Sequence, residues 1–570
     1  MRNADVAAVF NHLADLLEIE EANRFRVRAY RRAAATLEEL PESVETLVRQ
    51  GRDLTELPGV GEDLAGKIRE IVETGRCRML DEVEARTPSS LAALTSIPGL
   101  GPKRVQTLFR TLGVRTLEQL AAAAKAGRLR DLPRFGATLE AKVAEALARK
   151  AAEPGRIRLA TAEDFAKGLL AHMRGAPGLA DIAVAGSFRR RKETVGDLDL
   201  LVSTTDPQAA IDRFTGYDEA EKVTAKGPTR AQIVLRSGLQ VDLRAVEPQS
   251  WGAALHYFTG SKGHNIAIRQ RGQARGLKIN EYGVFRGEAR IGGRTEAEVF
   301  AAVGLPFIPP ELREDLGEID AAERGRLPKL IERADLRGDL HVHTRASDGK
   351  NTLAEMAKAA QDLGYEYLAI TDHSRHATIA HGLDPKRLSA QIDEVRRWND
   401  AHDGLRLLAS CEVDILADGS LDLPDSLLKR LDLVVGAVHF RFDLDARAQT
   451  ERILKAMDNP LFSVLAHPTG RLIGERPAYD LDLDRVLEGA RDRGCAVELN
   501  AHPSRLDLDD VHCRAAKALG LKVVIATDAH STLGLGAIGY GVDQARRGWL
   551  EAKDVLNTRP LANLKRLLAR

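Results

Sequence analysis

The sequence has few cysteines, no long apolar run and no excess of either charge. Its four cysteines in 570 residues have no disulfide spacing, which predicts reduced thiols in a cytoplasmic protein. No apolar stretch reaches the roughly 18 residues that a membrane span needs. The first residues also lack the apolar core of a secretory signal. We therefore expect a cytoplasmic protein with no membrane partner, and no feature of the sequence implies an oligomer.

The balance of charge argues at first against nucleic acid, because 83 basic residues are matched by 83 acidic ones. The average hides a local asymmetry, since residues 101–150 hold 11 Lys and Arg against 4 Asp and Glu. Phosphate binding needs a local basic face and not a basic protein. A DNA partner therefore stays open. The length of the chain predicts several domains.

A glycine-containing segment occurs three times in the N-terminal third. Residues 57–68 begin Leu-Pro-Gly-Val-Gly, residues 97–105 repeat the pattern, and residues 132–143 have Arg134 in place of the first glycine. Glycine lets a turn adopt positive φ and lets a phosphate approach the backbone, while the next helix points N–H groups at the anion. One copy is also typical of a plain helix-connecting turn. Two good copies beside basic residues favour phosphate binding, and for the third we expect a structural role only.

This pattern resembles the helix-hairpin-helix motif, which grips DNA phosphates without reading sequence. The resemblance implies a set of candidate DNA-binding residues in the first two copies: Gly59, Gly61, Lys67, Gly99, Gly101, Lys103 and Arg104.

Three carboxylates are predicted to meet in the middle of the chain. A Gly-Ser turn and a basic run follow a predicted buried strand at 182–185. Asp197 and Asp199 stand at i and i+2 of the next strand and therefore share a face, and a later strand brings in Asp242. Such carboxylates repel one another unless a cation lies between them, and three suit hard divalent cations in two-metal phosphoryl transfer. Asp-Leu-Asp alone is also typical of a solvated strand end, but the combination favours a metal site.

The order of these motifs resembles that of family X DNA polymerases, the DNA polymerase β-like nucleotidyltransferases, over about residues 1–310. The resemblance includes Tyr257-Phe-Thr-Gly-Ser261 and residues 278–283. It implies Mg²⁺ or Mn²⁺ at Asp197, Asp199 and Asp242, with Asp242 as general base for the primer 3′-hydroxyl. The nucleotide-binding residues that it implies are Gly186, Ser187, Arg190, Gly196, Tyr257, Phe258, Gly260, Lys262 and Asn265, and it implies that Arg269 contacts the template DNA.

The resemblance is incomplete around two lysines. Lys262 stands where animal relatives often carry an acid, and a cation there would pair with phosphate. Lys67 falls where some relatives keep a Schiff-base lysine, but its neighbours Asp63 and Met79 are not basic. We therefore do not expect a lyase activity.

The last 235 residues contain seven apolar runs that each lead to a potential metal ligand or a polar group that supports one. They cover residues 338–343, 368–373, 407–412, 434–439, 464–467, 497–502 and 524–530. Buried strands that deliver His, Asp and Glu at their C-terminal ends are how a barrel assembles a metal site. Helical stretches at 352–363, 385–401 and 509–519 alternate with them, which predicts a parallel sheet or an incomplete relative of the eight-stranded barrel.

A lone His-x-His such as His341-Val-His343 more often has a core or surface role. A whole set of such ligands is hard to explain as core, because buried unpaired carboxylates cost several kcal/mol each. The region resembles the PHP (polymerase and histidinol phosphatase) domain. The resemblance implies up to three divalent metals, zinc, manganese or iron, at His341, His343, Asp348, His373, Glu412, His439, His467, Asp528 and His530. It also suggests phosphate contacts at His381, Arg441 and Arg471, and a supporting role for Asn500.

We expect a multidomain α/β protein: a helical helix-hairpin-helix region, a nucleotidyltransferase α+β palm and thumb, and a C-terminal distorted (β/α)7 PHP barrel. The expected boundaries are 1–85, 86–150, 151–250 for the palm, 251–315 for the thumb, 316–335 for a linker and 336–570 for the barrel. The expected function is a bacterial-type family X DNA polymerase that fills short gaps in base excision repair, with gapped or nicked DNA and dNTPs as partners. The barrel would act as a 3′→5′ exonuclease, an abasic-site endonuclease or a 3′-end phosphoesterase.

Two other functions remain open at this point. One is a phosphatase of small phosphate esters with a DNA-binding appendage, which Asp197→Ala would leave fully active. The other is a non-catalytic scaffold that binds DNA ends, for which metals and dNTPs would not change DNA affinity.

Overall fold

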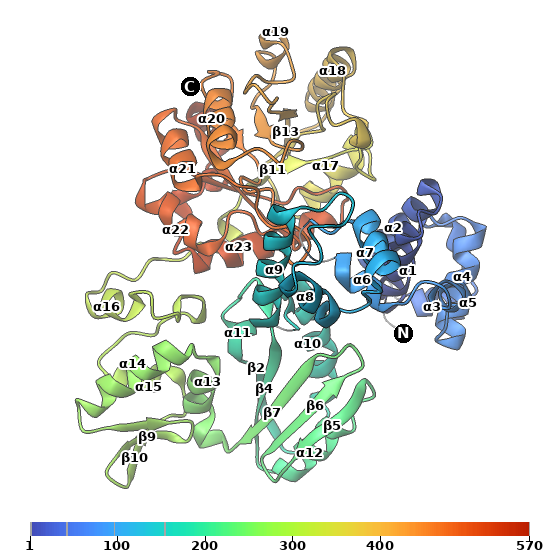
Figure 1. Cartoon of the computed structure of the whole chain (residues 1–570). Helices are drawn as coiled ribbons and strands as arrows, with labels where there is room; N and C mark the ends of the chain where they lie inside the picture. Colours follow the sequence, from blue (N-terminus) through green and yellow to red (C-terminus); the bar gives the residue numbers. More distant parts are fainter. Residues whose placement is uncertain (1–2, 41–43, 96, 98, 153–154, 569–570) are drawn as a thin grey trace. The chain divides into compact units, whose positions relative to one another are not determined.

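The computed structural model describes residues 3–40, 44–95, 97, 99–152 and 155–568 (Figure 1). The chain divides into two compact units. One is Met1–Glu153 with Leu472–Ala478, and the other is Pro154–Arg471 with Tyr479–Arg570. Among the described residues, every helix is too short or too polar to cross a membrane.

The N-terminal unit is helical. Its helices are α1 (Asn3–Ile19), α2 (Arg24–Glu39), α3 (Val44–Arg49), α4 (Glu62–Thr74), α5 (Arg78–Glu84), α6 (Ser90–Thr95), α7 (Pro102–Leu112), α8 (Leu117–Lys125) and α9 (Ala137–Ala152). One continuous apolar core extends from Val6 to Leu147. The two segments expected as separate domains, 1–85 and 86–150, therefore share this core.

The palm carries a five-stranded sheet in the order β2-β4-β7-β6-β5. Its strands are β2 (Leu179–Val184), β4 (Asp197–Thr204), β5 (Ala220–Lys226), β6 (Arg230–Leu235) and β7 (Gln240–Val246). Helices α10 (Leu159–Met173) and α12 (Pro207–Thr215) pack on one face against Leu198, Leu200 and Leu243. The alternation along β4 therefore places its aspartates on the opposite face, where Leu201 meets α13 (Trp251–Thr259).

The thumb combines helices with a small antiparallel sheet. Its elements are α13, α14 (Lys262–Gln273), β8 (Lys278–Asn280), β9 (Gly283–Arg286), β10 (Ala289–Gly292) and α15 (Glu296–Ala302). The segment 316–335, expected as a linker, packs into this domain: Ala322 of α16 (Glu318–Glu323) and Leu330 belong to the thumb core. Glu318 is fully buried and lies 2.7 Å from the ring of His264.

The C-terminal region is a parallel barrel. Its strands are β11 (Gly338–Val342), β12 (Tyr367–Ile370), β13 (Arg406–Ala409), β14 (Glu412–Asp414), β15 (Val435–Ala437), β16 (Val464–Leu465), β17 (Ala496–Asn500) and β18 (Val523–Ala526). They form sheets of three and five strands, and parallel bridges between His373 and Glu412 and between Val342 and Ala529 join the two. The run expected as one strand at 407–412 is thus split into β13 and β14. The helices expected to alternate with the strands are present as α17 (Leu353–Asp362), α18 (Pro385–Ala401) and α22 (Asp510–Ala518).

Candidate active sites

The hairpin glycines adopt the backbone that their pattern predicts. Gly59 has φ of 77° and Gly99 has φ of 84°, and each is followed by a glycine that begins a helix, α4 or α7. Arg134, which replaces glycine in the third copy, keeps a positive φ of 68°. The turn of the third copy therefore persists without its glycine. Pro98 of the second copy lies outside the described residues.

The basic residues of the hairpins differ in their contacts. Arg104 donates to the carbonyl oxygens of Gly99 at 2.7 Å and Arg134 at 3.1 Å, so it joins the second and third copies. Lys103 is exposed, 3.8 Å from Glu21. Lys67 pairs with Asp63 on the same helix. Lys103 is therefore the more open cation, and Arg104 is engaged in holding the turns.

The three palm aspartates lie on two adjacent parallel strands. Asp199 on β4 is directly opposite Asp242 on β7, and Asp197 is two residues before Asp199 on the same face. Side-chain amides hold Asp242 from two sides, because Gln240 donates to it at 2.8 Å and Gln232 at 3.0 Å. The structure thus brings together the three carboxylates that the sequence pattern predicted to meet.

Electrostatics shows that this trio fits a cation. Burial, followed by repulsion from Asp197 and Asp242, raises the pKa of Asp199 to about 7. Burial and the charge of Asp242 also raise the pKa of Asp197. Crowded carboxylates resist ionisation unless positive charge offsets them. An all-oxygen donor set of this kind suits Mg²⁺ or Mn²⁺.

The segment expected as a Gly-Ser turn forms the short helix α11 (Gly186–Arg189) beside Asp199. A Cβ atom on Gly186 would lie 2.1 Å from the Asp199 carboxylate, and φ is 60°, so only glycine fits there. Arg190 follows the helix and donates to Glu314 at 3.0 Å and to the Thr259 carbonyl at 2.6 Å. Ser187 in α11 is half-buried. The palm segment 186–190, which is expected to bind nucleotide phosphates, is therefore hydrogen-bonded to the thumb through Arg190.

Most of the other expected nucleotide-binding residues lie at or just after the C-terminal end of α13. Tyr257 and Phe258 pack edge to face with ring centroids 5.2 Å apart. Asn265 donates to the Tyr257 carbonyl at 2.6 Å, so its amide nitrogen contacts the backbone here, not an open groove. Gly260 follows α13 with φ of 71°, and Lys262 is exposed at the start of α14. Gly196, directly before Asp197, lies beside the side chain of Arg156.

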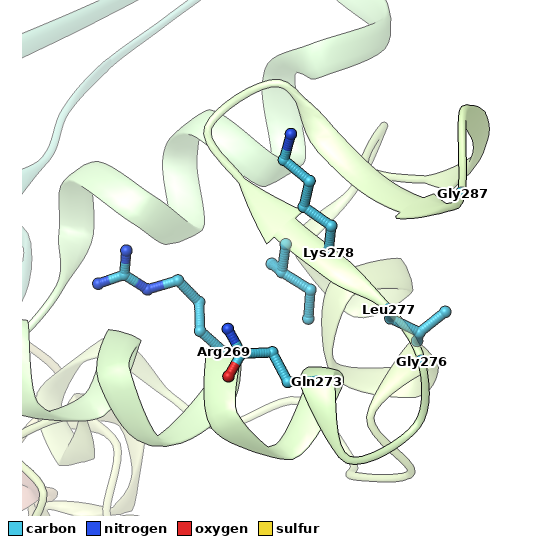
Figure 2. Close-up of a pocket in the computed structure, with 7 residues that line it drawn as sticks. Arg269, Gln273, Gly276, Leu277, Lys278 and Gly287 are labelled. Atoms are coloured by element: carbon cyan, nitrogen blue, oxygen red, sulfur yellow. The ribbon is translucent and has the colours of Figure 1, made fainter.

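Arg269 and Lys278 line a shallow thumb pocket of about 400 Å³ (Figure 2). Arg269 projects from α14 and also lies over the Tyr257 ring at 5.9 Å. Lys278 projects from β8. The two cations give the thumb a local positive surface.

The nine expected barrel ligands converge. Three groups have ligand atoms within 4.8 Å of one another: His343, Asp348, His373 and His530; His341, His343 and Asp528; and His373, Glu412 and His439. His467 joins through Nε2, 2.9 Å from Glu412. The His373 ring also lies 2.8 Å from the Glu412 carboxylate.

Unpartnered buried atoms show that metals fit this cluster. The ring nitrogens of His343, Nε2 of His341 and Oε2 of Glu412 are buried and have no hydrogen-bond partner among the described residues. Burial, followed by the charges of His530 and His373, lowers the pKa of His343 to about 4, which keeps its ring neutral as coordination requires. Mixed imidazole and carboxylate ligands suit zinc, manganese or iron.

A second layer of acids, not expected from the sequence, lies behind the histidines. Glu498 lies 2.7 Å from Nδ1 of His341, and Asp414 lies 2.9 Å from Nδ1 of His439. Such partners fix the ring orientation of a ligating histidine. The sequence does contain a pattern that indicates one of these acids: Asp414 stands two residues after Glu412, at the alternate position of a buried strand. Asn500, expected in a supporting role, donates to Asp528 at 3.1 Å.

Arg471, suggested as a phosphate contact, is engaged with groups of the protein itself. Its guanidinium pairs with Glu193 of the palm at 2.6 Å and donates to the carbonyl of Arg505 at 2.9 Å. Arg505, which was not expected at the site, lies 3.5 Å from Asp528. Arg505 therefore lies beside a barrel ligand, and Arg471 connects the barrel to the palm.

Comparison with known proteins gives four family matches. They are a helix-hairpin-helix domain at residues 1–77, a SAM-like helix-hairpin-helix tandem at 91–149, a DNA polymerase beta thumb at 254–314 and a PHP domain at 339–502. The DNA polymerase/3'-5' exonuclease PolX of Bacillus subtilis (strain 168) is 36% identical over 575 aligned positions, which cover 100% of both chains. This chain belongs to the PHP-containing family X DNA polymerases.

Two further relatives each match only part of this family X chain. DNA polymerase lambda of Rattus norvegicus is 25% identical over 341 residues, 53% of this chain and 56% of its own length. A probable phosphatase of Thermoanaerobacter sp. (strain X514) is 28% identical over 232 residues, 39% of this chain and 89% of its own length. The fractions of this chain that the two relatives match are consistent with a polymerase region and a phosphoesterase region in one family X chain.

Proposed function

We propose that this chain is a DNA-directed DNA polymerase whose barrel hydrolyses phosphoesters of the same DNA in the 3′→5′ direction. The observation that carries the proposal is the face that Asp197, Asp199 and Asp242 share on neighbouring strands beside α11. The name of the full-length Bacillus relative includes both activities, which supports the pairing.

In the palm, Asp197, Asp199 and Asp242 would hold Mg²⁺ or Mn²⁺, which neutralises triphosphate charge when bound. Asp242 would accept the proton of the primer 3′-hydroxyl, and the amides of Gln232 and Gln240 keep its carboxylate in place. The remaining nucleotide contacts would come from Gly186, Ser187, Arg190, Gly196, Tyr257, Phe258, Gly260, Lys262 and Asn265.

In the barrel, the nine ligands would hold up to three divalent metals, which supply an acidic water and a clamp for phosphate oxygens when bound. The contacts of His341 with Glu498 and of His439 with Asp414 orient two of the rings. Arg505 would meet a DNA phosphate beside Asp528. Exonuclease, abasic-site endonuclease and 3′-phosphoesterase actions all use this same bond cleavage.

The DNA partner would be gapped or nicked, with base excision repair as the setting. Backbone at Gly59, Gly61, Gly99 and Gly101 would receive phosphates without reading bases. Lys67, Lys103 and Arg104 would add charge to the hairpins, and Arg269 would contact the template.

The deciding experiment uses a 5′-labelled primer at a one-nucleotide gap, with Mn²⁺, with and without dNTPs. We expect Asp199→Ala to lose extension and keep 3′ shortening, and His341→Ala to do the reverse. A wild-type protein that neither extends nor shortens the primer would refute the proposal.

A second candidate is a phosphatase of small phosphate esters, because the matched Thermoanaerobacter relative is named a probable phosphatase and 89% of its length aligns with this chain. Steady-state hydrolysis of p-nitrophenyl phosphate by the wild type and by Asp197→Ala tests it. Efficient hydrolysis, equal in both proteins and without action on DNA, would favour this function over the first.

A further inference from the structure

One helix of the barrel docks on the polymerase region. Helix α23 (Ile538–Arg547) follows the loop of Asp528 and His530 through a short 3-10 helix. Its docking side chains are Tyr540 with Glu163 at 2.7 Å, Asp543 with Arg191 at 2.7 Å, Arg546 with Glu311 at 2.7 Å, and Arg547 with Glu314 at 3.0 Å. Residues 540, 543 and 547 stand three and four apart, so they share one face of the helix.

Arg547 ends this helix and contacts the arm that carries Arg190. It donates to the main-chain carbonyl of Arg190 at 2.8 Å and to Glu314 at 3.0 Å. Its other terminal nitrogen pairs with Asp510 of the barrel at 2.5 Å. The residue is only 7% exposed, so these bonds are largely shielded from water.

Arg190 depends on the same carboxylate. Its Nε donates to Oε1 of Glu314 at 3.0 Å, the oxygen that also accepts from Arg547. Lys192 lies 3.8 Å from that oxygen. Burial opposes ionisation of Glu314, but Arg190, Arg547 and Lys192 lower its pKa, so the group is a carboxylate. One negative charge thus faces three positive ones.

We infer that Arg547 of the barrel is a positioning residue for nucleotide binding in the polymerase site. It fixes the Arg190 backbone and shares Glu314 with the Arg190 side chain. Without Arg547, Glu314 would have one fewer cation to satisfy it and would pair more strongly with Arg190, in competition with a triphosphate. The inference rests on the proposed polymerase function and assigns part of its nucleotide site to the barrel.

The neighbouring Arg546 provides a matched control. It docks through Glu311 and the carbonyl of Ile331 instead of through Arg190 or Glu314. Arg546→Met therefore removes an arginine from the same helix and the same interface. A general loosening of the interface would affect both variants alike, whereas a positioning role belongs to Arg547 alone.

The test measures single-nucleotide gap filling by the full-length protein over a range of dNTP concentrations. For Arg547→Met we expect KM for the dNTP to rise about tenfold with kcat within about twofold, as for a lost binding contact. Arg546→Met should keep the wild-type KM, and Arg547→Lys should recover most of it, since a cation again faces Glu314. Shortening of the primer 3′ end should continue in all three variants.

Equal KM values for Arg547→Met and Arg546→Met in an active polymerase would overturn the inference. A wild-type protein that adds no nucleotide would instead refute the proposed function itself. If Arg547→Met does not fold, Glu314→Gln replaces it, because the shared acceptor is then weakened in place. A wild-type KM in Glu314→Gln would equally overturn the inference.

Discussion

The palm carboxylates and the barrel carboxylates are buried in opposite electrostatic environments. In the palm, three aspartates face one another without histidine, and Asp199 has its pKa raised to about 7 by burial and by its two neighbours. In the barrel, burial alone would raise the pKa of Glu412, yet His439, His373 and His341 hold it well below its usual value. The palm trio repels itself, whereas the barrel cluster is internally paired.

This difference predicts two ways of binding metal. A self-repelling trio gains most when a cation and substrate phosphates arrive together, as Mg²⁺ sites at polymerases do. A paired cluster of imidazoles and carboxylates is already arranged and backed by Glu498 and Asp414. It should therefore hold its metals between turnovers.

The largest expected effect separates the two sites completely. Asp242→Asn should reduce primer extension about 10²–10⁴-fold, the range for a lost general base, and leave 3′ shortening unchanged. Glu412→Gln should do the reverse, because Glu412 contacts His341, His373, His439 and His467. Rates on a gapped primer measure both.

Asp181→Asn on β2 is the matched control for the palm, since Asp181 is exposed and away from the trio. It should keep both activities. If Asp242→Asn also abolishes shortening, the two sites are not independent and the comparison fails.

A smaller effect is expected from the layer behind the barrel ligands. Glu498→Gln weakens the acceptor of the His341 ring and should raise the Mn²⁺ concentration needed for half-maximal shortening about 10–100-fold. Extension should not change. Glu488→Gln, on the exposed face of α21 (Leu483–Asp492), is the control. Matching Mn²⁺ curves for Glu498→Gln and Glu488→Gln would show that Glu498 does not support a ligand.

The sequence predicts the palm trio well, because its geometry is local. Strand alternation alone puts Asp197 and Asp199 on one face, and a neighbouring strand supplies Asp242. The barrel ligands are predictable for a similar reason, since all of them except Asp348, which follows in a loop, lie in or at the end of an apolar run. Glu498 stands inside such a run, and its partner His341 is 157 positions away, so only the closed barrel reveals the pair.

The docking role of α23 could not be predicted from its sequence. Its apolar face packs in the barrel core at Ile538, Val542 and Ala545. In sequence, its polar face does not differ from that of a helix exposed to solvent. What that face meets depends on how two domains pack. At Arg134 the sequence departs from the hairpin pattern, but the fold does not: the glycine is lost and the positive φ remains.

The opposite electrostatics should also appear as opposite changes in stability without metal. In a chelator, folded Asp199 keeps its proton up to about pH 7, whereas the unfolded side chain loses it near its ordinary value. The folded state therefore binds more protons between these values, and stability falls as pH rises through them. Asp199→Asn should raise the melting temperature by a few degrees at pH 8 and have less effect at pH 5.

Glu412→Gln should lower the melting temperature in the same chelator at pH 8, because it removes a carboxylate that several imidazoles contact. Differential scanning calorimetry of both variants at the two pH values measures the signs. A fall in melting temperature for both variants at pH 8 would refute the contrast between a repelling and a paired site.

The smallest expected effect concerns the DNA that both sites act on and its binding by the hairpin residue Lys103. Lys103 is 59% exposed at its side chain, and its contact with Glu21 at 3.8 Å is an exposed pair of little energetic value. If Lys103 binds a phosphate, Lys103→Ala should weaken gapped-DNA binding several-fold and reduce the slope of log affinity against log salt by about 1. Extension and shortening at low DNA concentration should then fall by the same factor. Lys125→Ala, an exposed lysine of α8 outside the hairpins, should change neither. A fall in only one activity would mean that the hairpin serves one site, and the two sites would then differ in how they receive DNA as well as in how they hold metal.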